Sequence, residues 1–193
     1  VSGNTLRSVL SDEEAVEIAS VIMKKLWKPV GDSNFQTIAD WGKGFERMRK
    51  KYNGNGPIPK ALFEKAEKQF SELLSSMGEQ VLLHGDLHHE NILLSNRDNF
   101  LAIDPKGVIG EREYEVGCFL RNPYPDIIKN PNAVAITQRR LRQFADGLGF
   151  GIKRLQQWAF AQAVLSLIWV IEDREEYSDY YISCAEIFDA VAV

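Results

Sequence analysis

The segment His84–Leu93 is rich in polar residues and leads from one short apolar run into another, which limits the folds open to this 193-residue chain. Gln80–Leu83 precede the segment and read as a strand. The polar stretch 96–99 separates Ile92–Leu94 from Phe100–Ile103, which predicts a hairpin of two strands. Polar side chains therefore stand at the ends of strands, where a rigid scaffold can direct them to one point.

Three side chains in and after this segment carry oxygen atoms at a spacing suited to phosphoryl transfer: Asp86, Asn91 and Asp104. That chemistry needs a carboxylate to accept a proton from the attacking hydroxyl, and metal ligands to neutralise phosphate charge. The four residues after Asp86 let the loop turn back, so that Asp86 faces an acceptor and the Asn91 oxygen faces a magnesium ion. Asp104 adds an anionic ligand for Mg²⁺, and Pro105 is expected to keep it extended. The pattern indicates a kinase catalytic loop.

Zinc binding is an alternative, because all three histidines of the chain, His84, His88 and His89, lie in this segment. The spacing argues against it. There is no H-E-x-x-H, and although His88 and Glu90 match the start of a zinc deaminase signature, no P-C-x-x-C follows. We interpret His84 as a structural brace of the loop, and the other two histidines as a solvated loop surface with one of them near the acceptor.

Most of the remaining chain has helical spacing of its apolar residues. Ser11 with Glu14, and Ser33 with Gln36, form capping-box patterns that begin two helices, the first over residues 12–27. Further helices are expected after Pro57 and Pro59, and over residues 135–144, 155–171 and 180–191. The helix over 155–171 is apolar on most sides, so we expect it to be central.

No segment before the polar loop reads as a phosphate-covering glycine loop or as a strand that carries a phosphate-binding lysine. Gly42–Gly44 falls inside a helical pattern, and Gly147–Gly151 lies between two helices, where a helix C-cap is the simpler explanation. The sequence looks like half of an enzyme. Because it begins with Val rather than Met, we expect it to be cut from something longer.

The composition is that of one ordinary globular domain. With 45% hydrophobic residues the chain can bury a real core, and a net charge of -4 offers no basic field for nucleic acid, which is not expected as a partner. Cys118 and Cys184 lie in apolar surroundings, as buried thiols of a reducing compartment would, so we expect a cytoplasmic protein. No apolar run is long enough to span a bilayer, and no membrane association is expected.

These motifs resemble the aminoglycoside phosphotransferase branch of the protein-kinase-like fold, and more narrowly the antibiotic-resistance kinases of the streptomycin 6-kinase or hydroxyurea phosphotransferase type. The likeness extends over essentially the whole chain. The segments that carry it are His84–Leu93, Ile103–Glu111, Tyr114–Gly117, Leu120–Pro123 and Trp169–Asp173.

The resemblance implies an α+β fold that is mainly α: a protein-kinase-like C-terminal lobe with a short catalytic β-hairpin, the N-terminal lobe being absent. The lobe would span residues 1–193. Within it, residues 1–79 would be a helical segment, 80–123 the catalytic and metal loops, and 124–193 the C-terminal helices.

The resemblance also implies an activity, the ATP-dependent transfer of the γ-phosphate to a hydroxyl of an aminoglycoside-like antibiotic. Asp86 would be the catalytic base, and Asn91 and Asp104 would bind Mg²⁺ and through it ATP. In such enzymes the N-terminal lobe carries the phosphate-covering loop and the nucleotide lysine, so this chain alone is expected to be inactive.

Cationic antibiotics call for an acceptor pocket rich in carboxylates. Glu172 and Asp173, at the end of the long apolar helix, are candidates for substrate contact, as are Glu111 and Glu113 after the metal loop. The glutamates at 175 and 176 are equally well explained as a solvated helix end.

Two residues need separate interpretation. Glu115 stands where the family often has Asp, at the end of the loop after the metal aspartate, and we expect its longer side chain to brace that loop without taking part in the chemistry. Lys106, after the metal aspartate, is interpreted as facing water, with phosphate binding as the alternative.

Two other functions remain open. One is a catalytically silent module that still binds a ligand in an acidic pocket. The other is a helical interaction domain with a vestigial loop, able to self-associate through the apolar surface on which an N-terminal lobe would pack.

Overall fold

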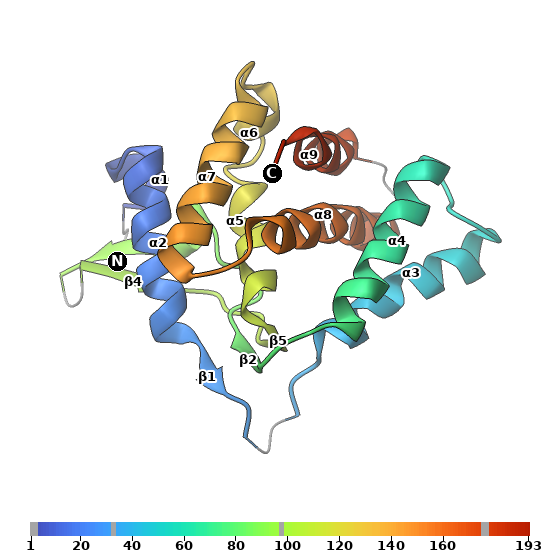
Figure 1. Cartoon of the computed structure of the whole chain (residues 1–193), viewed down its shortest axis with the longest axis horizontal. Coiled ribbons are helices and arrows are strands. Elements are labelled where there is room, and N and C mark those ends of the chain that lie inside the picture. The colour runs from blue at the N-terminus through green and yellow to red at the C-terminus, as the bar shows by residue number, and fades with distance from the viewer. Residues whose placement is uncertain (1–3, 32–33, 97–98, 175–177) are drawn as a thin grey trace.

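A long helix, α8 (Ile152–Arg174), crosses the centre of the molecule, and most other helices pack around it (Figure 1). The computed structural model describes residues 4–31, 34–96, 99–174 and 178–193. From Leu155 to Ile168 every residue of α8 except Gln157 is buried, which confirms the expectation of a central helix. The helices that contact α8 are α3 (Ile38–Tyr52), α4 (Lys60–Ser75), α5 (Val116–Leu120), α7 (Ala133–Leu148) and α9 (Asp179–Ala190).

The first long helix, α2 (Asp12–Leu26), begins at the capping box that the sequence predicts. The Ser11 hydroxyl accepts a hydrogen bond from the Glu14 N–H, and the Glu14 carboxylate accepts one from the Ser11 N–H at 2.9 Å. Two orphan donors of the first turn are thereby satisfied. α2 packs against α7, and the short helix α1 (Leu6–Val9) precedes it.

The predicted start of α3 is wrong. Its capping box is Thr37 with Asp40: the Thr37 N–H donates to the Asp40 carboxylate at 3.0 Å, and the Asp40 N–H donates to the Thr37 hydroxyl at 3.1 Å. Ser33 lies outside the described residues, and Gln36 instead accepts a hydrogen bond from the Trp41 indole. The box directly before the apolar stripe prevails because capping acts within the first turn.

Glycines explain two other helix features, in agreement with their structural interpretation. α7 ends at Gly149, which adopts the left-handed conformation with φ of 76° and so caps the helix. Gly42 lies inside α3, where a Cβ atom would collide with the ring of Phe70 on α4. Neither glycine follows a strand or faces the loop at 84–93.

Two small antiparallel sheets carry the polar loop. The first has the order β1 (Lys28–Pro29), β2 (Gln80–Leu83), β5 (Val108–Glu111), and the second pairs β3 (Ile92–Ser95) with β4 (Asn99–Ala102). The β3–β4 pair confirms the predicted hairpin, although β4 ends one residue earlier than expected. The loop from 84 to 91 joins the two sheets, and residues 103–107 join them again. Asp86 and Asp104, the two candidate carboxylates, therefore lie in the two segments that join the sheets.

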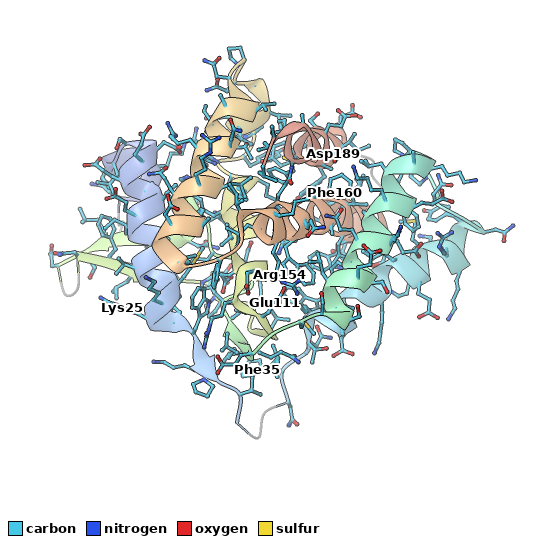
Figure 2. The ribbon with its side chains drawn as sticks, viewed as in Figure 1. Lys25, Phe35, Glu111, Arg154, Phe160 and Asp189 are labelled. Carbon is cyan, nitrogen blue, oxygen red and sulfur yellow. The ribbon has the colours of Figure 1, made fainter. Side chains whose placement is uncertain are left out.

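A buried polar cluster joins the first sheet to the central helix. The Glu111 carboxylate accepts hydrogen bonds from Arg154 Nε and Nη2, both at 2.8 Å, and from the Trp158 indole. Figure 2 shows Arg154 of α8 beside Glu111 of β5. Glu111 is 1% exposed, so its charge is compensated inside the protein.

Within the described ranges no helix combines the length and apolar content needed to cross a bilayer.

Candidate active site

The loop after β2 turns at Gly85. Its φ of 81° lies in the left-handed region, which glycine adopts without the steric cost that a side chain imposes. A Cβ atom here would also lie 2.9 Å from the Trp41 ring. The turn directs Asp86 into a pocket, where its side chain keeps 28% of its exposure.

His84 connects the loop to the segment after β4, as the structural interpretation of this histidine expects. Its Nδ1 accepts a hydrogen bond from the Asp86 N–H at 3.3 Å, so its proton is on Nε2, which donates to the Ile103 carbonyl at 2.9 Å. Burial lowers the pKa of His84, in agreement with a neutral ring. Its own carbonyl accepts from the N–H groups of Lys106 and Gly107 at 2.9 and 3.1 Å. His84 thus fixes the loop at 84–91 relative to the segment at 103–107.

Glu115 binds the main chain at the start of the loop at 84–91. Its carboxylate accepts hydrogen bonds from the N–H groups of His84 at 2.7 Å and of Gly85 at 2.9 Å, so the loop that it braces is the one at 84–91 and not the one after Asp104. The side chain is 1% exposed, and this burial raises its pKa to about 7. Desolvation outweighs the two hydrogen bonds, which favour the charged form.

The polar groups around Asp86 fix its orientation and that of Asn91. The Cys118 thiol, whose pKa burial raises well above its ordinary value, donates to Asp86 Oδ1 at 3.1 Å. Asn91 Nδ2 donates to the Asp86 carbonyl at 2.8 Å, which leaves the Asn91 amide oxygen as the group available to a cation. The Asn91 carbonyl accepts from the Ile103 N–H at 2.9 Å, so Asp104 follows directly beside it.

Asp104 does not adopt the extended conformation that the following proline predicts. Its φ is 57°, in the left-handed region. The paired hydrogen bonds from Lys106 and Gly107 to the His84 carbonyl turn the chain back and override the preference set by Pro105. The carboxylate is exposed, with 64% of its surface accessible.

Lys106 lies between the two carboxylates, so its interpretation as facing only water is wrong. Its Nζ lies 2.7 Å from Asp104 Oδ2 and 3.8 Å from Asp86 Oδ2. The ion pair holds the pKa of Asp104 below its ordinary value and raises that of Lys106. The sequence signal was ambiguous because it does not give the direction of a long side chain.

The three histidines point in different directions. His88 Nδ1 lies 3.0 Å from Glu90 Oε2, and its Nε2 lies 3.9 Å from Asp86 Oδ1. His89 is 2% exposed and stacks on Phe119 with ring centroids 3.9 Å apart, so its placement on a solvated surface is wrong. Burial lowers the pKa of His89 to about 3 and keeps it neutral. In the described part of the chain, no group of three or more His, Cys, Asp or Glu side chains is arranged to hold a metal.

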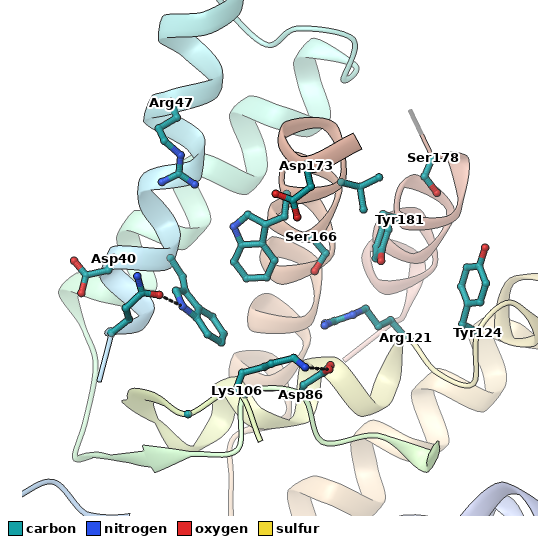
Figure 3. Close-up of a pocket in the computed structure, with 16 residues that line it drawn as sticks. Asp40, Arg47, Asp86, Lys106, Arg121, Tyr124, Ser166, Asp173, Ser178 and Tyr181 are labelled. Carbon is teal, nitrogen blue, oxygen red and sulfur yellow. Dashed lines mark hydrogen bonds and ion pairs between the residues drawn. The ribbon is translucent and has the colours of Figure 1, made fainter. Parts of the chain in front are cut away.

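A pocket of about 860 Å³ opens above Asp86 (Figure 3). Its walls come from α3 and from Gln36 just before it, from α8, from the region of α9 and from the chain after α5. Trp41 and Trp169 form one aromatic corner, with ring centroids 5.3 Å apart and the rings nearly perpendicular. The lining residues that carry charge are Asp40, Arg47, Asp86, Lys106, Arg121 and Asp173.

The structure brings some of the substrate candidates to this pocket and not others. Asp173 lines it, whereas Glu172 forms a two-point ion pair with Arg47 across α3 and α8, with both N–O distances 2.8 Å. Glu111 is buried in the cluster around Arg154, and Glu113 does not line the pocket. The glutamates at 175 and 176 lie outside the described residues.

Sequence reasoning missed the residues that α3 and the chain after α5 bring to the pocket. Asp40 is one; its hydrogen bonds from Lys43 and then Thr37 hold the pKa of its carboxyl well below the usual range. Arg47 and Arg121 are others, so the described lining has three carboxylates and three cations and is not the acidic wall expected. For Arg121 there was one sequence signal, since it lies in the segment Leu120–Pro123 that carries part of the family resemblance.

Two solved structures that share this fold are a choline kinase and an aminoglycoside phosphotransferase. Choline kinase LicA from Streptococcus pneumoniae superposes with a TM-score of 0.67 at 12% identity, covering 97% of this chain and 66% of that one. Aminoglycoside phosphotransferase APH(4)-Ia, in a complex with ADP and hygromycin B, gives a TM-score of 0.63 at 17% identity, covering 100% of this chain and 70% of that one. The fold is therefore kinase-like and mainly helical, as predicted.

The chain belongs to the aminoglycoside/hydroxyurea antibiotic resistance kinase family, whose model matches residues 2–174. It is 25% identical to a streptomycin 6-kinase of Streptomyces glaucescens over 174 residues, which is 89% of this chain and 56% of that protein. It is 38% identical to a streptomycin 3''-kinase of Klebsiella pneumoniae over 106 residues, 53% of this chain and 39% of that protein. The chain thus spans about half the length of the curated relatives it matches, and the predicted family is confirmed.

Proposed function

We propose that this chain is the catalytic C-terminal lobe of an ATP-dependent kinase that phosphorylates a hydroxyl of an aminoglycoside-like antibiotic of the streptomycin or hydroxyurea type. One observation carries the proposal. Asp86 lies on the floor of the pocket, while Asn91 and Asp104 are joined to the same loop by hydrogen bonds through Ile103 and His84. This arrangement supports the assignment of a proton acceptor for the hydroxyl and of oxygen ligands for the phosphate-bound metal.

Asp86 would act as the general base. An acceptor hydroxyl in the pocket gives its proton to the Asp86 carboxylate as its oxygen bonds to the γ-phosphorus, and the bond from that phosphorus to the leaving oxygen of ADP breaks. The Cys118 thiol and the backbone around Gly85 hold the carboxylate in position for this transfer.

The donor set fits a magnesium ion. Asn91 presents its amide oxygen, because Nδ2 is engaged, and the Asp104 carboxylate is exposed. Mg²⁺ binds proteins through one or two hard oxygen groups and keeps water and phosphate as its other ligands. When bound, it would neutralise the charge of the nucleotide phosphates.

The pocket walls would select the acceptor. Asp173 and Asp40 supply carboxylates for amino or guanidino groups. The Trp41 and Trp169 rings offer apolar faces over which a cation or a sugar ring could lie. Because the lining also contains cations, charge alone does not select the acceptor, and the placement of its polar groups matters.

The test is streptomycin-dependent release of ADP by this chain coexpressed with the N-terminal lobe of a streptomycin 6-kinase relative. Asp86→Ala should reduce kcat at least about a hundredfold, as expected for loss of a general base. Asp146→Asn is a matched control, because it removes an exposed carboxylate on α7 that does not line the pocket. An active preparation in which Asp86→Ala retains full activity would show that the base is misassigned.

A catalytically silent binding module is the alternative, and the formation of the pocket from this chain's own elements favours it as a second candidate. Calorimetry on the chain alone separates the cases: heat with streptomycin but no ADP release in the assay above would support the module. No heat with streptomycin or Mg-ATP would exclude it.

Light scattering across a range of concentrations tests the predicted self-association, which a monodisperse monomer would contradict.

A further inference from the structure

The roles proposed so far leave two cations beside Asp86 unexplained. Lys106 and Arg121 both line the pocket, and Figure 3 shows their side chains reaching toward Asp86 from opposite sides. They come from different segments, one after β4 and one after α5. Two cations that flank a catalytic carboxylate suggest a site for an anion.

Lys106 is held by the site itself. Its Nζ lies 2.7 Å from Asp104 and 3.8 Å from Asp86, and its backbone N–H is fixed by the His84 carbonyl at 2.9 Å. The side chain still keeps 49% of its surface accessible. The ammonium is therefore positioned between the proton acceptor and the expected metal ligand and remains open to a ligand.

Arg121 differs from the other arginine of the pocket. Arg47 is neutralised by its two-point ion pair with Glu172. Arg121 donates from Nη1 to the neutral Gln162 amide oxygen, and no carboxylate of the described residues lies within ion-pair distance of it. A partly buried guanidinium without a carboxylate is costly unless an anion satisfies it during function.

We propose that Lys106 and Arg121 together bind the phosphoryl group while it passes to the acceptor, a proposal that rests on the proposed kinase function. As the acceptor oxygen bonds to phosphorus and the bond to ADP breaks, negative charge is spread over the three equatorial oxygens. Preorganised cations in a partly dry site stabilise such charge. Both side chains keep their protons throughout, since the hydroxyl proton goes to Asp86.

A simpler role for Lys106 is to neutralise Asp104, and it predicts a different result. In that case Lys106→Met would remove a competitor for Asp104, so binding of Mg²⁺ would tighten and kcat would stay the same. The phosphoryl-binding role instead predicts that binding of an anion weakens in Lys106→Met and also in Arg121→Met. The side chain of Arg121 bonds to Gln162 and not to Asp104, so its loss frees no metal ligand.

The first test is an NMR titration of the 193-residue chain with inorganic phosphate in a buffer that contains Mg²⁺. Lys106→Met and Arg121→Met should each weaken phosphate binding about tenfold or more, since a hydrogen bond to a charged group is lost. Lys43→Met is the control, because Lys43 pairs with Asp40 at 2.7 Å on another wall of the pocket. Equal affinities for the wild type and both Met variants, or no phosphate binding by the wild type, would overturn the proposal.

The second test is kinetic and uses the active kinase preparation. Both Met variants should reduce kcat about tenfold to a hundredfold with little change in the KM for streptomycin, and Lys106→Arg and Arg121→Lys should restore part of the loss because they keep the charge. Unchanged kcat together with tighter binding of Mg²⁺ would overturn the proposal for Lys106. If the wild type shows no kinase activity, the proposed function fails, and the phosphate titration still decides whether the two cations form an anion site.

Discussion

Replacement of Glu115 by glutamine tests how the loop at 84–91 is held. In the wild type the buried carboxyl has a pKa of about 7, against an ordinary value of 4.5. Between these two pH values the folded protein binds more protons than the unfolded chain, so the free energy of unfolding falls as the pH rises. A difference of about 2.5 in pKa corresponds to about 3 kcal/mol, and Glu115→Gln should lack this loss.

The assay is urea unfolding followed by tryptophan fluorescence at a series of pH values from about 4 to 8, on the wild type and on Glu115→Gln. Other carboxyls titrate in both proteins, so the difference between the two curves isolates Glu115. Relative to the variant, the wild type should lose stability progressively from pH 4.5 and level off above pH 7. At acid pH the variant should be the less stable protein, because its amide cannot accept from both the His84 and Gly85 N–H groups.

A control of opposite sign is available in Glu46→Gln. The pKa of Glu46 on α3 lies below its ordinary value because Lys50 donates a hydrogen bond to it. The wild type should therefore gain stability over Glu46→Gln as the pH rises through the acid range. Parallel curves for the wild type and Glu115→Gln from pH 4.5 to 8 would refute the reasoning, because the two N–H donors would then be keeping the carboxylate charged despite its burial.

Gly85→Ala should destabilise the protein by about 1–2 kcal/mol from the left-handed backbone alone, and more from the contact with Trp41, which thermal unfolding would detect; an unchanged Tm would contradict the assigned turn. Arg140→Met removes the buried partner of Asp12, which keeps its ion pair with Arg139, and should cost about 1–3 kcal/mol in urea unfolding, a loss that would be absent if the pair were dispensable. Asp173→Asn should raise the KM for streptomycin several-fold and leave kcat nearly constant, and an equal fall in kcat would mean that this carboxylate acts on the transition state instead.

The sequence predicted those parts of the fold that depend on local pattern. The hairpin of β3 and β4 follows from two apolar runs around a polar turn, and the central position of α8 follows from a helix that is apolar on most sides. The loop at 84–91 could be recognised because its polar residues have fixed spacing. The start of α3 was predicted wrongly from Ser33 and Gln36, because the capping box that forms is Thr37 with Asp40, directly before the apolar stripe.

The site was predictable where its residues are neighbours in sequence, and not where they meet across the fold. Nothing in the sequence indicates that Glu111 turns inward to Arg154, while Arg121, ten residues later, turns toward the pocket. The conformation of Asp104 was missed for the same reason, since it depends on hydrogen bonds to the carbonyl of His84 twenty residues earlier. A local rule for the residue before proline cannot include such contacts.

The division of labour around His84 has an evolutionary consequence. The groups proposed for chemistry are fixed by main-chain hydrogen bonds and by the buried Glu115, whereas α3 and α8 supply side chains to the pocket walls. Substitutions on those two helices can therefore reshape the pocket without moving the loop at 84–91. Divergence within such a fold would then change the shape and charge of the pocket while the loop is inherited unchanged.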